Sequence, residues 1–245
     1  MAPAICSRAR ELLTRSNMKP LCPCSASGHD ASCTLVHLGP IVAQGDGSIL
    51  RRGTWKGRPV LLSVATGGQS LADCPSSLVG VEVPHHAALL HVSPARVIHA
   101  AAKGRPLDEC DAVASPYALA RICRQALEAV SQMAERGFVY RRLMAGRILV
   151  DAEGDVTVVG HTFASTSDGS AEHEAVRAVA WAMLDAWSPI APLVAEPRAS
   201  EFAAALVGHL EAGARGDYES ASTMVTALSS ISTDRRRQSA ALAAA

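Results

Sequence analysis

The residues of this sequence best suited to chemistry at first sight lie near its beginning, at Cys22, Cys24, His29 and Cys33. Thiolates and imidazoles are the ligands that zinc prefers in proteins, so this group could bind a zinc ion. Its spacing, however, lacks the paired two-residue gaps of common zinc modules. We therefore interpret the cysteines as free thiols, with a zinc site as the alternative.

The segment that carries these cysteines, residues 1–33, is rich in Ser, Cys, Pro and Gly and has no hydrophobic period. It is predicted to be a flexible leader, and residues 233–245 are predicted to be a disordered tail. The chain holds seven cysteines, an odd number without regular spacing, which favours a reducing compartment such as the cytoplasm. Residues 1–20, with several arginines and few acids, could instead act as a transit peptide to an organelle.

Composition limits the partners that the chain can have. Its 245 residues are 49% hydrophobic, enough for a sizeable core of one or two domains. Lys plus Arg number 23 and Asp plus Glu number 23, so no overall field attracts nucleic acid or an acidic membrane surface. The most apolar long window, Val176 to Ala195, is interrupted by charged and proline residues and cannot span a bilayer. We expect neither nucleic acid nor a membrane as a partner.

Two kinds of hydrophobic pattern divide the rest of the chain, beginning with strands. Residues 38–100 hold short Val and Leu runs broken by Gly and Pro, a pattern typical of β-hairpins. A helix is predicted after Ser115, which can cap it, because Pro116 suits the first turn and apolar residues recur at helical spacing until Gly137.

The second half predicts one more hairpin and then helices. Residues 148–150 and 156–159 are β-branched runs, and the Asp and Gly residues of 151–155 between them favour a turn, with Asp151 and Asp155 as turn formers. Three helical stripes follow, at Val176–Trp187, Phe202–Leu210 and Tyr218–Leu228. The whole pattern predicts an α+β fold.

Two stretches resemble a known family in the same order. Residues 137–162 read GFVYRRLMAGRILVDAEGDVTVVGHT, which resembles the protein kinase pattern G-[FI]-V-H-R-D-L-K-x-x-N-I-L-V-D-x-x-G-x-V-K-V-x-D-F-G without any insertion. Residues 53–63, GTWKGRPVLLS, look like the G-x-W-x-G-x-x-V-A-V-K passage of tyrosine-kinase-like serine/threonine kinases. The resemblance covers roughly residues 38–230. It implies a bilobal domain over residues 34–232, with a small β-rich N-lobe (about 34–108) and an abbreviated helical C-lobe (about 109–232).

The resemblance fails at the residues that carry phosphoryl transfer in the family. Arg142 replaces the Asp that accepts the substrate's proton, and a guanidinium cannot act as that base. Arg147 replaces the Asn that holds a magnesium ion, and Gly160 replaces the metal-binding Asp of D-F-G. Ser63 replaces the strand Lys that binds the nucleotide phosphates. The chain is therefore expected to have no catalytic residue and no metal site.

The nucleotide site implied by the resemblance is degenerate as well. Of the glycines in the phosphate-binding loop, only Gly45 coincides with the family pattern, or Gly45 and Gly47 in a shifted register. Leu61 stands where a small Ala lines the adenine slot, and Leu149 lines the same pocket, so the pocket is expected to be filled by side chains. No cofactor is expected, with ATP bound without magnesium as the alternative.

The resemblance would also gather Arg141, Arg142 and Arg147 where active kinases hold metal and phosphate, which would make that cleft basic. Arginine forks match phosphate and carboxylate oxygens, so the three side chains could bind a phosphate or an acidic peptide. Alternatively they pair with nearby acids such as Asp151 and Asp155, or face water.

We interpret the chain as a catalytically inactive protein-kinase-like domain, a pseudokinase, that binds or scaffolds a protein partner in signalling. Two alternatives stay open. One is a divergent but active serine/threonine kinase that transfers phosphate from ATP, and the other is a helical interaction domain with decayed kinase ancestry. Tyr140 and His161, in place of the family's His and Phe, are expected to serve packing.

Overall fold

Strands come first along the chain and helices later, in a mixed fold that confirms the expected α+β class. The computed structural model describes residues 36–231, apart from 46, 68, 72, 111–114, 168–169, 190 and 192–195. The predicted leader with its cysteines and the predicted tail lie outside the described residues. The described residues belong to one compact unit.

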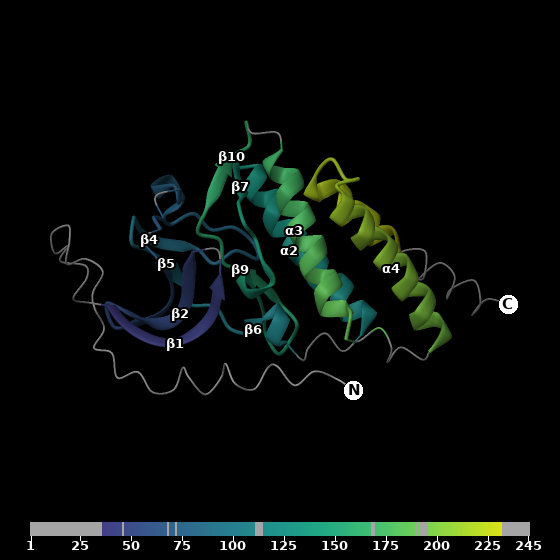
Figure 1. The fold of residues 1–245 in the computed structure, drawn as a ribbon, viewed down its shortest axis with the longest axis horizontal. Coiled ribbons are helices and arrows are strands. Elements are labelled where there is room, and N and C mark those ends of the chain that lie inside the picture. Colours follow the sequence, from purple (N-terminus) through teal and green to yellow (C-terminus); the bar gives the residue numbers. More distant parts are fainter. Residues whose placement is uncertain are drawn as a thin grey trace. The chain divides into compact units, whose positions relative to one another are not determined.

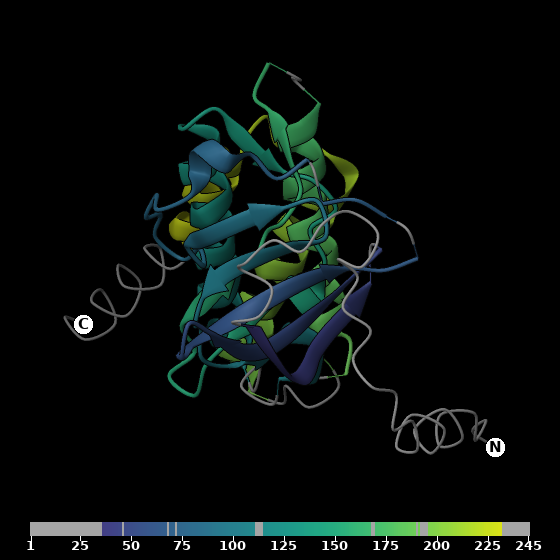
Figure 2. The same cartoon turned by 90° about the vertical axis from the view of Figure 1, so that its left-hand side faces the viewer.

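Five antiparallel strands form one sheet in the order β1-β2-β3-β5-β4, which Figure 2 shows in front of the helices. They are β1 (Val36–Gly45), β2 (Ser48–Trp55), β3 (Arg58–Ala65), β4 (Leu89–Ser93) and β5 (Arg96–Ala100). Lys56 and Gly57 join β2 to β3 with φ angles of 51° and 75°, the left-handed conformation that a two-residue hairpin needs to match the twist of the sheet. The hairpins predicted within residues 38–100 are confirmed.

The connection from β3 to β4 contains little regular structure. Its described residues, 66–88 without 68 and 72, hold the short 3₁₀ helix η3 (Ser76–Leu78) and no α-helix. This agrees with the sequence, in which no helical period is present between Thr66 and Pro84.

The helix α2 (Pro116–Ala134) forms where it was predicted and for the predicted reasons. Ser115 Oγ accepts a hydrogen bond from the backbone N of Ala118 at 3.2 Å, and Pro116 occupies the first turn. The predicted apolar stripe is buried at Leu119, Ile122, Cys123, Ala126, Leu127, Val130 and Met133. The chain leaves the helix through Gly137, whose φ of 86° favours glycine.

Two small sheets follow α2. The strand β7 (Phe138–Tyr140) pairs with β10 (Phe163–Ser165), and β8 (Ile148–Val150) pairs with β6 (Arg105–Pro106) and β9 (Val156–Val158). In the turn between β8 and β9, Asp151 Oδ1 accepts hydrogen bonds from the backbone N of Glu153 at 3.1 Å and of Asp155 at 2.8 Å. The predicted hairpin is therefore confirmed, and so is the role of Asp151 as a turn former.

Helices complete the described chain. They are α3 (Ala171–Trp187), α4 (Pro197–Arg215) and the helical residues 221–231. The helix α4 extends beyond the predicted stripe at both ends, and the final helix begins after Tyr218. In Figure 1, α2, α3 and α4 lie side by side, and contacts join each of the three pairs. None of the helices in the described part of the chain combines the length and the apolar content needed to cross a membrane.

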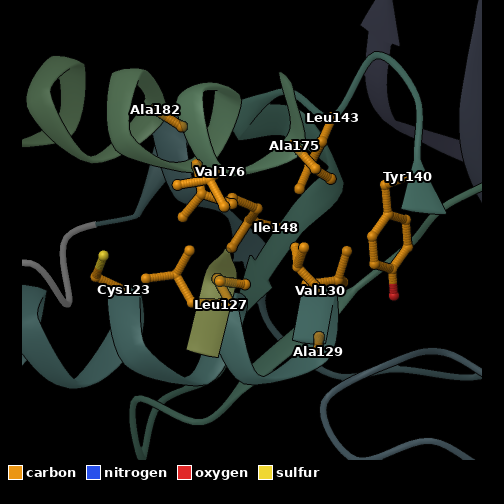
Figure 3. Close-up of a cluster of buried hydrophobic side chains, with 14 of the residues drawn as sticks. Cys123, Leu127, Ala129, Val130, Tyr140, Leu143, Ile148, Ala175, Val176 and Ala182 are labelled. Atoms are coloured by element: carbon orange, nitrogen blue, oxygen red, sulfur yellow. The ribbon is translucent and has the colours of Figure 1, made fainter. Parts of the chain in front are cut away.

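The main hydrophobic core lies between these helices and the small sheets. Figure 3 shows Leu127 and Val130 of α2 opposite Val176 of α3, with Ile148 of β8 close by. All four side chains are fully buried. The core is thus built largely from medium-sized aliphatic residues and alanines, as the low aromatic content of 4% leads one to expect.

Candidate functional site

The candidate site lies where the β1–β2 hairpin meets the 3₁₀ helix η5 (Ala145–Arg147), which leads into β8. A Cβ atom on Gly146 would lie 2.9 Å from the Cβ of Ala43, and one on Gly45 would lie 2.6 Å from the Met144 methyl carbon. Carbon atoms do not approach so closely, so glycine at residue 146 lets the hairpin lie directly on this segment, whereas at residue 45 the flexible Met144 side chain could move aside. Gly47 contacts a different partner, since its Cβ would lie 2.9 Å from the side chain of Gln69.

Apolar side chains fill the interior beneath the hairpin. Leu61 of β3 and Leu149 of β8 are both fully buried and belong to one cluster with Leu50, Ala87 and Val159. The structure therefore brings together the two residues predicted to line a nucleotide pocket. The side chains of this cluster pack against one another in the interior.

Arg147, at the end of η5, is the largest fully buried side chain among the described residues, with 1% of its surface exposed. Its Nη1 donates a hydrogen bond to Ser63 Oγ of β3 at 3.1 Å, and its Nη2 donates to Ser48 Oγ of β2. A guanidinium keeps its charge and has only donors, so both hydroxyl oxygens act as acceptors here. The arginine thus connects two strands of the large sheet to the segment before β8.

Two histidines extend this set of hydrogen bonds. His99 Nε2 of β5 lies 3.1 Å from Ser63 Oγ, and His161 Nε2 lies 3.3 Å from Ser48 Oγ. Burial lowers the pKa of His99 well below its usual value, and the nearby guanidinium charge of Arg147 lowers it further. The imidazole of His99 is therefore neutral, and its Nε2 can accept the hydroxyl proton of Ser63.

We call the five side chains the arginine network: Ser48, Ser63, His99, Arg147 and His161. The pair Ser63 and His99 has the spacing of a nucleophile and its base. Both residues are, however, 0% exposed, and the hydroxyl oxygen already accepts from Arg147. A substrate cannot reach such a pair, so the network acts as a structural connection between the sheet and the segment before β8.

Gly160 lies where a side chain would collide with an aromatic ring. A Cβ atom there would lie 2.4 Å from the ring of Tyr140, which is 1% exposed and packs against Phe163 with 5.3 Å between ring centroids. An aspartate at this position would require Tyr140 to move. The aromatic packing expected of Tyr140 is therefore what excludes the acid at residue 160.

The hydroxyl of Tyr140 makes a hydrogen bond of 2.8 Å with His86 Nδ1. Burial raises the pKa of Tyr140 well above its usual value and lowers the pKa of His86 to about 4. The tyrosine therefore stays protonated, and its hydroxyl donates a hydrogen bond to the neutral imidazole. Through this hydrogen bond, His86 of the loop before β4 joins the aromatic cluster of Tyr140 and Phe163.

The three arginines of the predicted anion site differ in burial. Arg141 and Arg142 are exposed, and Arg142 has a φ of 53°. The Arg147 side chain is buried in the arginine network. The structure therefore places two of the three at the surface and one in the interior.

Sequence reasoning singled out Ser63 and Arg147 but missed their partners Ser48, His99 and His86. His161 was expected to pack, and it is 2% exposed, but it also bonds to Ser48. The available signal was weak: a serine or histidine within an apolar strand, such as Ser63 and His99, has to find a hydrogen-bond partner in the interior. Nothing in the sequence says which partner it is.

An open pocket of about 770 Å³ lies beside this region, lined by the loop before β4 and by the residues after β5. Its charged lining residues are Glu82, Lys103 and Asp151. Neither Arg147 nor the leucine pair Leu61 and Leu149 lines it. Among the residues that the structure describes, no group of three or more His, Cys, Asp or Glu could hold a metal ion.

Fold and site together define an α+β domain in which a buried cationic network joins an antiparallel sheet to the segment before β8. No family model matches this chain, and neither does any curated protein.

Proposed function

We propose that this chain is a catalytically inactive, bilobal protein-kinase-like domain that works by binding a protein partner. The order of its elements supports this proposal: a five-stranded antiparallel sheet, the long helix α2, the hairpin β8–β9 and further helices. The two stretches that resemble kinases, residues 53–63 and 137–162, fall on β2–β3 and on the β7–β9 region. These are a strand pair and a loop region comparable to those that carry the family's motifs.

The contact between Arg147 and Ser63 carries the inactive part of the proposal. By the resemblance, these residues stand at the positions of the magnesium-binding Asn and the phosphate-binding Lys. In an active kinase the metal ions and the nucleotide phosphates lie between those two groups. Here Arg147 Nη1 is 3.1 Å from Ser63 Oγ, so the two side chains occupy the space themselves.

The chemistry argues against weak residual activity. Loss of one well-placed electrostatic group in an active site costs about 10²- to 10³-fold in rate. This chain lacks the acids at residues 142 and 160, the amide at 147 and the amine at 63. Phosphoryl transfer depends almost entirely on such groups, so a turnover useful to a cell is not expected.

Thermal unfolding with ATP, with and without magnesium, tests the proposal. A ligand that binds the native state raises the free energy of unfolding by mass action, by about 2.7 kcal/mol at a ligand concentration of 100 Kd. The melting temperature Tm rises with it. We expect no shift with either mixture, and no transfer of labelled phosphate to a generic protein substrate. The divergent active kinase would be established instead by two results together. One is a magnesium-dependent rise in Tm, and the other is transfer of labelled phosphate that is lost when a substitution blocks the cleft. A rise with ATP alone would support a nucleotide-binding pseudokinase.

A further inference from the structure

The five strands of the large sheet carry basic side chains and no acidic one. Within β1 to β5 there are four arginines, Arg51, Arg52, Arg58 and Arg96, and neither Asp nor Glu. Net charge is zero over the whole chain, so the sheet is a locally positive region of a neutral protein.

Several of these groups share the face of the sheet that is turned away from the arginine network. Directly paired residues of neighbouring strands point to the same face. Arg51 pairs with Ile41 on one side and with Leu62 on the other, and Leu62 pairs with Ile98, which pairs with His91. Figure 2 looks at the sheet from the side away from the helices. We call this face the outer sheet face: Leu38, Ile41, Arg51, Trp55, Lys56, Arg58 and His91.

Trp55 forms an aromatic platform on this face. Its ring packs on the buried cluster of Val60, Leu62 and Ile98 and lies 5.9 Å from the ring of His91, centroid to centroid. The ammonium of Lys56 lies 4.4 Å from the Trp55 ring centroid. A large rigid side chain held in this way offers contact area at little cost in conformational entropy.

Apolar and cationic groups surround the platform without partners of their own. Leu38 and Ile41 of the edge strand β1 are 45% and 47% exposed. Within the described residues, Arg51 and Arg58 form no ion pair. The face therefore combines exposed apolar surface with positive charge.

The chain's own terminal segments do not complement this face. Residues 1–33 contain more basic than acidic side chains, and residues 233–245 contain three arginines and one aspartate. A basic segment would be repelled by Arg51, Lys56 and Arg58. An occupant has to come from another molecule and has to bring carboxylates.

We propose that the outer sheet face binds an acidic, partly apolar peptide segment of another protein. This rests on the proposed function in that the partner is a protein, and it adds where and by what chemistry the partner binds. Carboxylates of the segment pair with Arg51 and Arg58, and its apolar side chains cover Leu38, Ile41 and the Trp55 edge. A nucleic acid would leave the exposed Leu38 and Ile41 uncovered, and the three cationic side chains of the face would neutralise few phosphates.

Fluorescence anisotropy with three labelled probes tests the proposal on the full chain. The probes are a peptide of Glu, Gly and Leu, a matched peptide with Lys in place of Glu, and single-stranded oligo-dT. We expect the Glu peptide to bind with an affinity that falls as salt rises, and the Lys peptide not to bind. Lys56→Glu with Arg58→Glu, both exposed, should weaken binding about tenfold or more, which corresponds to about 1.4 kcal/mol.

The matched control reverses the same number of charges at two exposed arginines away from this face, Arg121→Glu on α2 and Arg136→Glu just after it, and should keep the wild-type affinity. Leu38→Ser with Ile41→Ser should also weaken binding, with Tm measured to show that each variant folds. Failure of the Glu peptide to bind, equal binding by the Lys56 and Arg58 double variant, or tighter binding of oligo-dT would overturn the proposal. So would loss of binding in Arg141→Glu with Arg142→Glu alone.

The two proposals fail separately in these experiments. A magnesium-dependent Tm rise with ATP would overturn the inactive kinase-like function and leave the anisotropy result unchanged. Absence of peptide binding would overturn the docking surface and leave the nucleotide result unchanged.

Discussion

The helical core and the junction beneath the β1–β2 hairpin are both fully buried, but their chemistry differs. Leu127, Val130 and Val176 in the core are apolar and contact one another through interchangeable aliphatic surfaces. At the junction, Arg147 brings a permanent charge into the interior and fixes it through the hydroxyls of Ser48 and Ser63. The helical core is stabilised by apolar packing, and the junction is stabilised by directed hydrogen bonds.

This difference teaches what each region specifies. An aliphatic core tolerates exchange of residues if volume is kept, because its attraction has no direction. A buried charge costs free energy unless its hydrogen bonds are made, so it admits only the arrangement that makes them. The core therefore supplies stability, and the arginine network sets how the hairpin sits on the segment before β8.

The largest expected effect comes from Arg147→Ala. The change removes hydrogen bonds to Ser63 and Ser48 and leaves a cavity, at a total cost of about 3–5 kcal/mol in the free energy of unfolding. Arg147→Met fills most of the volume but makes no hydrogen bond, and should still cost about 2 kcal/mol. Urea denaturation followed by circular dichroism measures both values.

The matched pair in the helical core is Leu127→Ala and Leu127→Met. We expect about 2–5 kcal/mol for the alanine and less than about 1.5 kcal/mol for the methionine. If methionine restored stability equally well at residues 127 and 147, the arginine network would stabilise the protein by packing alone. The two regions would then not differ in the way described.

Acid should weaken the molecule through its buried histidines. The pKa of His86 is lowered from 6.5 to about 4, and burial lowers the pKa of His99 in the same direction. The unfolded chain therefore binds more protons than the folded one between pH 6.5 and about 4, so the free energy of unfolding falls as pH falls through this range. Urea midpoints at a series of pH values measure it.

The variant His86→Gln should flatten this pH dependence, and the same substitution at the exposed His37 should leave it unchanged. A stability that stayed constant or rose from pH 6.5 to 4 would show that the two imidazoles are already charged in the folded protein.

A smaller effect is expected at the contact between η5 and β1. Gly146→Ala places a methyl group 2.9 Å from the Cβ of Ala43 and should cost about 1–3 kcal/mol. Gly208→Ala is the control, because a Cβ there meets nothing within 4 Å on the exposed side of α4, and it should stabilise the protein by about 0.5–1 kcal/mol. Thermal unfolding of the two variants compares them, and a stabilising Gly146→Ala would show that the hairpin does not lie on η5.

The smallest expected effect concerns the cap of α2. Ser115→Ala removes the acceptor for the Ala118 amide and should cost about 1 kcal/mol. Ser115→Asp should retain most of the stability, since a carboxylate also accepts at this position. A cost as large as that of Arg147→Ala would mean that local caps, and not long-range hydrogen bonds, dominate this fold.

Much of the fold was accessible from the sequence because its signals are local. The Ser115 cap and the apolar stripe of α2 lie within one helix, and the Asp151 turn closes over four residues. Less of the candidate site could be predicted from the sequence. Ser63 and Arg147 were singled out through a resemblance, but their mutual hydrogen bond joins positions 84 apart, and that between Ser48 and His161 joins positions 113 apart.

The sequence by itself determined the α+β class and the positions of the main helices and hairpins. Only the tertiary structure decided that Arg147 points inward while Arg141 and Arg142 stay at the surface. The physical reason is range. Periodicity and capping act between residues a few positions apart, whereas the environment of a charged side chain depends on which distant strands fold against it.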